Sequence, residues 1–183
     1  MPMCDAYIPA GFLDEDTERT LVARVTDILV GHEIRRIVDL MDDPQTTERI
    51  RKRARAIAWA FVHRTDTYVA GVPAQAPVYK FVCSIPEGQI DEFFIPAANR
   101  DIMAAVVDAE GGRWEHPERR VWVFVHEIPD GTWGAGGNPL HLDNIIDFVA
   151  PGMGAAAVER FNGTKQLKAQ ELLAQAHASS RNG

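Results

Sequence analysis

Apolar residues follow two different periods along the first part of the chain. Residues 3–8 read as a short strand, and the Pro-Ala-Gly that follows is a turn, because proline fixes one backbone dihedral and glycine tolerates the others. The spacing of a helix then appears, at Leu21, Val22, Val25, Ile28 and Leu29. Asp14 is expected to be its N-cap and Gly31 its end. A further apolar run, residues 57–63, predicts a second strand and completes a β-α-β unit.

The same succession of elements returns in the second half of the chain. Residues 78–85 predict a strand, residues 97–109 a helix, and residues 121–127 another strand. The buried side of this helix is expected to carry Ile102, Met103, Val106 and Val107. The run TYVAGVP closes the first unit, and PDGTWGAGG closes the second.

Two short echoes show that the units are copies of one another. IPAGFLDED begins at Ile8 and IPEGQIDEF at Ile85, a separation of 85 − 8 = 77 residues. WAFVHR begins at Trp59 and WVFVHE at Trp122, in the same order. An internal repeat of this kind indicates two similar supersecondary units that bury a shared core.

The predicted fold class is α/β, with two tandem β-α-β units forming one sheet with two helices on one face. Strands joined through a helix should be parallel, with a right-handed crossover. The other face of the sheet is left uncovered in this arrangement and requires a partner. We therefore expect an oligomer of identical chains.

The domain prediction is one fused domain over residues 1–150, followed by a tail over residues 151–183. Unit one covers 2–76 and unit two covers 77–150. Residues 32–53 are polar and charged and are interpreted as an insertion in unit one that holds one or two helical pieces. The tail has helical composition over residues 165–178; packing on a neighbour and mobility both remain open for it.

Composition narrows the classes of function. The 183 residues carry a net charge of −7, which argues against nucleic acid as a partner. The basic run from Arg49 to Arg55 is interpreted as a solvated face, with nucleic-acid binding as the alternative. Cys4 and Cys83 show no metal-binding or disulfide spacing and are expected in the core. No apolar stretch reaches membrane-spanning length and no secretory signal is seen, so a cytoplasmic protein without membrane contact is expected.

Taken together, these motifs resemble the tautomerase superfamily, typified by 4-oxalocrotonate tautomerase and macrophage migration inhibitory factor. The chain begins Met-Pro and continues with strand, Pro-Ala-Gly turn, helix, strand and Gly-rich hairpin. Its strongest element is VFVHEIPDGTWGAGG, which is similar to the family's strand and glycine-aromatic hairpin. The fused form looks more like the cis-3-chloroacrylic acid dehalogenase and malonate semialdehyde decarboxylase branches, and the resemblance covers about residues 2–150.

The resemblance implies a cofactor-independent and metal-independent enzyme whose catalytic group is Pro2. Removal of Met1 would leave Pro2 as the amino-terminal residue, with a secondary amine that acts as general base in the family. An α-amino group has an ordinary pKa of about 7.7–8.0, and desolvation disfavours its charged form. The free amine can then take a proton next to a carbonyl group. A homotrimer is implied by the family's two-unit members.

Four further residues are expected to bind the small-molecule substrate. Trp133 matches the hairpin aromatic that shapes the family's pocket, with packing at a subunit interface as the alternative. Tyr7 is a candidate for orienting a substrate oxygen, and Trp122 for an aromatic wall of the pocket. His126 would hold or donate a proton if it faced the pocket, but its repetition at His63 also fits a structural hydrogen bond.

Departures from the family pattern shape the functional prediction. The arginines of the 4-oxalocrotonate enzymes are replaced by Phe12 and Trp122, and those of the dehalogenase branch by Pro86 and Gln89. The nearest candidates for binding an anion are Arg64, Lys80 and Arg120.

The expected function is a keto–enol isomerase acting on a 2-keto or enol carboxylic acid. The alternatives are a hydratase, dehalogenase or decarboxylase of small acids that uses Pro2 as an acid, and a non-catalytic member of the fold.

Overall fold

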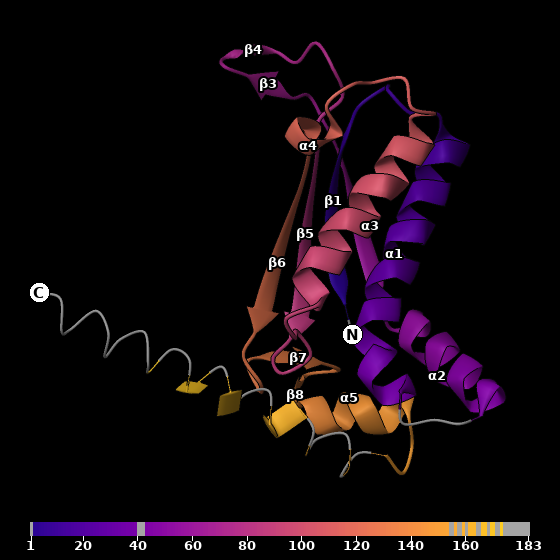
Figure 1. The fold of residues 1–183 in the computed structure, drawn as a ribbon, viewed down its shortest axis with the longest axis vertical. Coiled ribbons are helices and arrows are strands. Elements are labelled where there is room, and N and C mark those ends of the chain that lie inside the picture. Colours follow the sequence, from indigo (N-terminus) through magenta and orange to yellow (C-terminus); the bar gives the residue numbers. More distant parts are fainter. Residues whose placement is uncertain are drawn as a thin grey trace, which may run out of the picture.

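A four-stranded sheet forms the centre of the molecule (Figure 1). The structure is a computed structural model that describes residues 2–39 and 43–153, together with residues 156, 159, 161–163, 166, 167, 169, 170 and 173. The strands are ordered β2-β1-β5-β6, with the bounds β1 (Met3–Pro9), β2 (Trp59–Thr65), β5 (Tyr79–Pro86) and β6 (Val121–Ile128). β1 pairs with β2 and β5 with β6 in parallel, whereas β1 and β5 are antiparallel. The prediction of two fused β-α-β units in one sheet is confirmed.

Two helices, α1 (Glu15–Val38) and α3 (Phe94–Ala109), cover one face of this sheet (Figure 1). The Asp14 carboxylate caps α1 by accepting a hydrogen bond from the Thr17 backbone N–H at 2.7 Å. The Asp91 carboxylate accepts one from the Phe94 backbone N–H at 3.0 Å, at the start of α3. Alternate residues of β1 and β5, including Cys4 and Cys83, are buried beneath the helices, as predicted.

The prediction that α1 ends at Gly31 is wrong, because the helix continues to Val38. Ile34 and Ile37 extend its buried face, and their burial outweighs the roughly 1 kcal/mol that glycine costs inside a helix. α3 likewise begins three residues before the predicted Ala97, because Phe94 is itself buried.

A second apolar cluster closes the end of the sheet at which β1 begins. The helix α2 (Pro44–Ala56) is capped by Asp43 and lies in the segment predicted to contain helical pieces. The helix α5 (Leu142–Val149) packs against α2 and the last turns of α1 (Figure 1). Buried members of the cluster are Val30, Ile34, Ile37, Ile50, Ala54, Leu142, Ile145, Ile146, Val149, Ala150 and Phe161.

Two small hairpins follow the parallel strand pairs at opposite ends of the sheet (Figure 1). The hairpin β3 (Tyr68–Val69) with β4 (Val72–Pro73) follows β2, and β7 (Trp133–Ala135) with β8 (Asn138–Leu140) follows β6. The loop before β6 contains the short helix α4 (Pro117–Arg120). The helix predicted over residues 165–178 lies largely outside the described residues.

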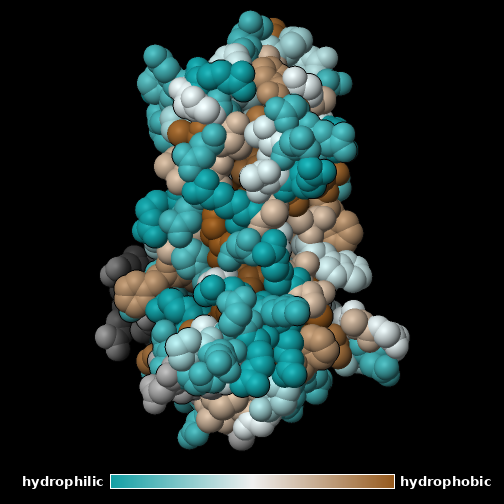
Figure 2. Space-filling model, turned by 90° about the vertical axis from the view of Figure 1, so that its right-hand side faces the viewer, coloured by the Kyte–Doolittle hydropathy of each residue, from teal (hydrophilic) through white to brown (hydrophobic). Residues whose placement is uncertain are grey.

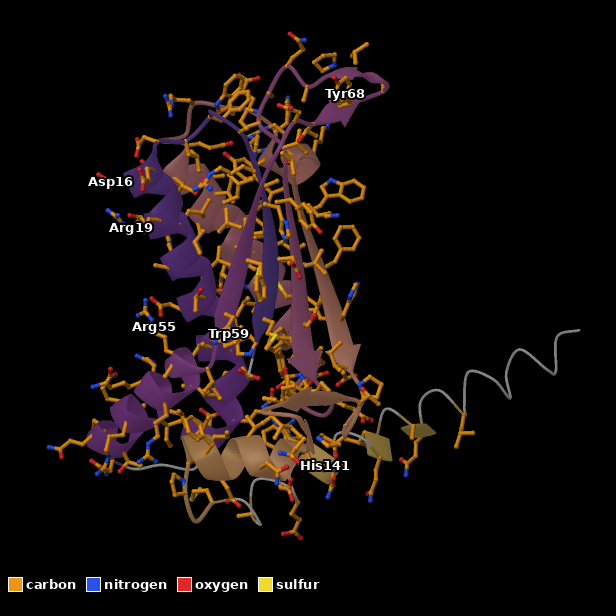
Figure 3. All side chains as sticks on the ribbon, turned by 180° about the vertical axis from the view of Figure 1, so that it is seen from behind. Asp16, Arg19, Arg55, Trp59, Tyr68 and His141 are labelled. Atoms are coloured by element: carbon orange, nitrogen blue, oxygen red, sulfur yellow. The ribbon has the colours of Figure 1, made fainter. Side chains whose placement is uncertain are left out.

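The two surfaces of the molecule differ in character. The outer side of α1 and α2 is mainly hydrophilic (Figure 2). The sheet face away from the helices instead exposes large aromatic side chains along both edge strands: Trp59, Phe61, Trp122 and Phe124. Trp59 and Trp122 are each 58% exposed, and Trp59 is seen at the lower end of the sheet in Figure 3. Within the described residues, the structure contains no helix that is both long and apolar enough to cross a membrane.

Candidate functional site

Pro2 is buried immediately before β1, between the start of β2 and the turn that follows β5. Its carbonyl oxygen accepts a hydrogen bond from the Trp59 backbone N–H at 3.3 Å, at the start of β2. On the other side, Met3 lies opposite Ser84, so Pro2 faces the end of β5 and the turn that follows it. This turn contains Gly88 and Gln89. Pro2 therefore lies at the end of the sheet at which β1 begins, beside the lower turns of α1 and near the second apolar cluster (Figure 1).

A small cavity at this end combines two polar side chains with aliphatic walls. Glu33 from α1 and Gln89 from the turn line it, together with Ile34, Ile37, Ala54, Ile57, Ile145, Ile146 and Val149. We call it the Glu33–Gln89 cavity. Its volume is about 10 Å³, which is room for roughly one water molecule. Ile57 lies just before the start of β2 and Gln89 just after the end of β5, so the cavity adjoins the strand ends that flank Pro2.

Glu33 is a carboxyl group in an apolar environment, with only 2% of its surface exposed. Burial raises the pKa of the Glu33 carboxyl above its ordinary value, and the positive charge of the N-terminal ammonium group partly opposes that rise. This ammonium group is that of Met1, which lies outside the described residues; removal of Met1 would transfer the terminal amine to Pro2. A buried acid near an amine is an arrangement suited to proton transfer.

Gln89 and Trp133 present buried polar atoms with unused hydrogen-bonding capacity. Gln89 is 3% exposed, and its side-chain oxygen Oε1 has no hydrogen-bond partner within the described part of the chain. Trp133, on β7, packs against the same apolar cluster, and its indole Nε1 also lacks a partner among the described residues. Buried polar groups are normally hydrogen-bonded. An acceptor and a donor left over at one end of the molecule therefore indicate a site for a polar ligand.

The structure does not bring Tyr7 or Trp122 to Pro2 within one chain. Tyr7 lies five residues further along β1, roughly 16 Å away at the rise of a strand. Its ring stacks on His63 with 4.5 Å between ring centroids, and the Lys80 Nζ lies 4.0 Å from the Tyr7 ring centroid. Trp122 pairs in register with Lys80 on the open face of the sheet, near the same end as Tyr7.

His126 lies at the same end of the sheet as Pro2 but on its open face. It pairs with Ser84, which in turn pairs with Met3, so two strand spacings, or about 10 Å, separate His126 from β1. His63, its counterpart in the first unit, lies with Nε2 2.8 Å from the Asp5 carboxylate. The structural interpretation of the repeated histidine therefore fits His63.

The three cations considered from the sequence are engaged elsewhere. Arg64 pairs with Glu18 on α1, and Lys80 lies over Tyr7. Arg120 is buried and makes a bidentate ion pair with Glu110, at 2.7 and 2.9 Å. These contacts stabilise the fold at a distance from Pro2. No group of three or more possible metal ligands occurs among the described residues.

Another cation, Arg36, lies close to the turn at Gln89. Its guanidinium donates a hydrogen bond to the Gly88 carbonyl oxygen at 3.3 Å and lies over the Phe161 ring, 4.9 Å from the ring centroid. The sequence reasoning missed Arg36 and Glu33 because it ended α1 at Gly31. The available signal was the apolar period Val30, Ile34 and Ile37, which places Glu33 on the buried face.

This arrangement of two fused β-α-β units is the tautomerase-superfamily fold, as comparison with solved structures shows. The resemblance inferred from the sequence is therefore confirmed at the level of the fold. A structure of the protein Pt0534 inactivated by 2-oxo-3-pentynoate is 18% identical, with a TM-score of 0.56. The match covers 78% of this chain and 98% of that one.

Two further structures extend the comparison. A fused 4-OT protein, solved as a symmetric trimer, is 16% identical with a TM-score of 0.53, over 74% of this chain and 93% of that one. A member of the cis-3-chloroacrylic acid dehalogenase family is 20% identical with a TM-score of 0.50, over 75% and 82% of the two chains. Neither a family model nor a curated protein matches the sequence. These neighbours are proteins of the tautomerase superfamily with sequences only distantly similar to this chain.

Proposed function

We propose that the protein is a cofactor-independent tautomerase-like isomerase that interconverts the keto and enol forms of a 2-keto carboxylic acid. Pro2, freed by removal of Met1, is the general base. The observation that carries this proposal is the burial of Pro2 at the start of β1, in a fold shared with tautomerase-superfamily proteins. The adjoining cavity is lined by Gln89, whose Oε1 has no hydrogen-bond partner among the described residues.

The chemistry follows from the environment of the amine. A buried amine is less readily charged than one in water, so part of it is neutral near pH 7. The neutral nitrogen takes a proton from the carbon next to the carbonyl group, and the enol forms when the oxygen is protonated. The aliphatic walls and Trp133 suit an apolar or aromatic substituent on the acid.

The substrate carboxylate requires a cation, and Arg36 is our candidate. Its guanidinium donates a hydrogen bond to the carbonyl oxygen of Gly88, the residue before Gln89. A planar guanidinium binds a carboxylate through two parallel hydrogen bonds. Arg36 would thus bind the substrate carboxylate, as arginines at other positions do in the family that the sequence resembles.

We also propose a homotrimer that buries the open face of the sheet. Its aromatic residues, Trp59, Phe61, Trp122 and Phe124, form an exposed apolar surface of the kind that marks protein interfaces. The fused 4-OT neighbour, which has a similar fold, is a symmetric trimer. In such an assembly, Tyr7, His126 and Trp122 would lie at subunit boundaries, and a neighbouring copy can bring them closer to Pro2 than a single chain does.

The proposal is tested by two measurements on the purified protein. Intact-mass analysis should show a chain that begins at Pro2, because a retained Met1 blocks the amine. Ketonisation of phenylenolpyruvate, followed by ultraviolet absorbance, should be fast in the wild type and at least about 100-fold slower in Pro2→Ala, since general base catalysis contributes about 10²–10⁴-fold. A retained Met1, or equal rates for the two proteins, rules out Pro2 as the base.

One observation favours a second candidate function, in which Pro2 acts as an acid. The N-terminal ammonium group opposes the rise in the pKa of Glu33 that burial causes, so a charged pair of carboxylate and ammonium is the arrangement that this function requires once Pro2 carries the terminal amine. The protein would then be a hydratase, dehalogenase or decarboxylase of small acids. Turnover of 3-halopropenoates or malonate semialdehyde, without enol ketonisation, would establish this alternative. A protein inactive on both groups of substrates would be a non-catalytic member of the fold.

A further inference from the structure

We propose that Glu33 is a second catalytic residue, a neutral carboxylic acid that protonates the substrate oxygen while Pro2 removes the proton from carbon. The inference rests on the proposed function, because it concerns the same reaction at the same end of the sheet. It assigns to this chain a proton donor on α1 in addition to the amine on β1.

The first argument is the position of Glu33 on its helix. Val30, Ile34 and Ile37 flank it on the buried face of α1, and the carboxyl group forms part of the wall of the Glu33–Gln89 cavity. Placing an ionisable group among aliphatic side chains costs several kcal/mol if the group stays charged. An aliphatic residue would fill this position at lower cost. The carboxyl group therefore supplies the cavity wall with an ionisable group that filling the space does not require.

The second argument is a pair of buried polar atoms at this end of the molecule: Gln89 lines the cavity, and Trp133 packs against the apolar cluster that supplies most of its walls. Gln89 Oε1 is an acceptor and Trp133 Nε1–H is a donor, and both are buried without partners in the described part of the chain. An enol hydroxyl donates to an amide oxygen, and a carbonyl or carboxylate oxygen accepts from an indole N–H. A 2-keto acid and its enol supply both a hydroxyl donor and an oxygen acceptor, so the two buried polar atoms fit the substrate class of the proposed function.

The proton balance closes with the two groups acting together. The cycle begins with neutral Pro2 amine and neutral Glu33 carboxyl. Pro2 takes a proton from the carbon, the C–H electron pair forms the C=C bond, and Glu33 gives its proton to the carbonyl oxygen. The enol leaves behind a protonated amine and a carboxylate, and one proton passes back from the amine to Glu33, directly or through a water. No proton is gained or lost overall, and the reverse direction uses the same steps.

The surroundings favour the neutral starting state. Among the described residues that line the cavity, Glu33 is the one ionisable group, since α2 contributes Ala54 and α5 contributes Ile145, Ile146 and Val149. The charge that faces Glu33 is that of the N-terminal ammonium group, and Arg36 lies one helical turn further along α1, toward Gly88. Burial disfavours two separated charges more than it disfavours two neutral groups.

The kinetic test compares two glutamate variants on the same helix. Glu33→Gln keeps the size of the side chain and removes the acid, and we expect kcat for phenylenolpyruvate to fall about 100-fold or more with little change in KM. Glu18→Gln, at the other end of α1 where Glu18 pairs with Arg64, is the matched control and should keep wild-type rates. The wild-type pH profile should lose one of its two ionisations in Glu33→Gln.

A spectroscopic test is independent of turnover. Infrared spectra at pH 7 should show the C=O stretch of a protonated carboxyl group in the wild type, and this band should be absent in Glu33→Gln and present in Glu18→Gln. If the band is missing from the wild type, or if Glu33→Gln retains wild-type kcat and pH profile, the inference is wrong. The proposed function has a separate criterion, because Pro2→Ala would still be inactive in that case.

Discussion

At the residue scale, Glu33 occupies an environment that carboxylates rarely occupy. Its carboxyl group is almost fully buried beside aliphatic side chains and interacts with the chain's amino terminus. Glu110, the other deeply buried glutamate among the described residues, instead has a bidentate arginine partner in Arg120. We therefore interpret Glu110 as a carboxylate that stabilises the fold, and Glu33 as a carboxyl group whose pKa depends on the surroundings of the candidate site.

The raised pKa of Glu33 predicts how stability depends on pH. Because the folded pKa is above the unfolded one, the folded protein holds a proton that the unfolded chain releases. The contribution is fully present below the unfolded pKa of about 4.3 and is lost as the pH rises through the folded pKa. Within that window, the free energy of unfolding of the wild type should fall relative to Glu33→Gln by up to about 1.4 kcal/mol per pH unit.

Urea unfolding of both proteins between pH 4 and pH 8 measures this difference. Glu18→Gln serves again as the control and should follow the wild type over the same range. Parallel curves for the wild type and Glu33→Gln would mean that Glu33 ionises normally in the folded protein.

At the scale of elements, the length of α1 decides what the site contains. Its first half covers the sheet, and the turns beyond Gly31 carry Glu33 and Arg36 to the end at which β1 begins. α2 and α5 then enclose this end by packing on the extension. The cavity has room for about one water molecule, so binding of a substrate there requires the residues that line it to move apart.

Two glycine substitutions test the assignment of Gly31 to the helix interior. A Cβ atom at Gly31 meets nothing within 4 Å, and the backbone there is helical, so Gly31→Ala should stabilise the protein by about 0.5–1 kcal/mol. Gly11 also has open space around it, but its φ is +78°, a left-handed conformation that alanine disfavours. Gly11→Ala should therefore destabilise the protein by about 1 kcal/mol or more.

Urea denaturation of both variants gives the comparison. Neither substitution creates a steric clash, so opposite signs of the change in unfolding free energy would report the effect of backbone conformation alone. A destabilised Gly31→Ala would place Gly31 at a helix end, as the sequence alone first indicated.

At the scale of the whole molecule, the sheet has one covered and one open face. The helices bury alternate residues of the strands, and the open face carries the aromatic edges together with Asp5, Tyr7 and Lys80 between them. The open face therefore has an apolar strip along each edge and polar side chains between the two strips. The outer helical surface in Figure 2 is by contrast mainly hydrophilic.

Charge on the aromatic edge should therefore disrupt the proposed trimer. Trp122→Glu places a carboxylate on the open face, and light scattering after size exclusion should show the trimer replaced by single chains. Phe93→Glu is the control, because Phe93 is 61% exposed at the start of α3, on the helical side of the molecule. A wild type that is already a single chain, or a Trp122→Glu protein that stays trimeric, would contradict the assignment of this face.

Much of the fold was accessible from the sequence because it depends on short-range patterns. Alternation in residues 78–85 and helical spacing around Leu21 to Leu29 identified the elements, and the repeat gave their order. The candidate site was less accessible. Trp133 was identified through the hairpin motif, and it packs against the second apolar cluster. Tyr7 and Trp122 were also expected at the site, but within one chain they lie far from Pro2, toward the other end of the sheet.

By itself, then, the sequence determined two repeated β-α-β units, a sheet with helices on one face, and a proline at the start of its first strand. Local periodicity contains that information, since a helix is specified by neighbours three or four residues away and a strand by neighbours two residues away. The tertiary structure alone decided that α1 passes through Gly31 and that Glu33, Gln89 and Trp133 gather at one end of the sheet. These contacts join residues far apart in the chain, and no local pattern shows which distant side chains will meet, so the grouping of these polar side chains follows from the tertiary structure.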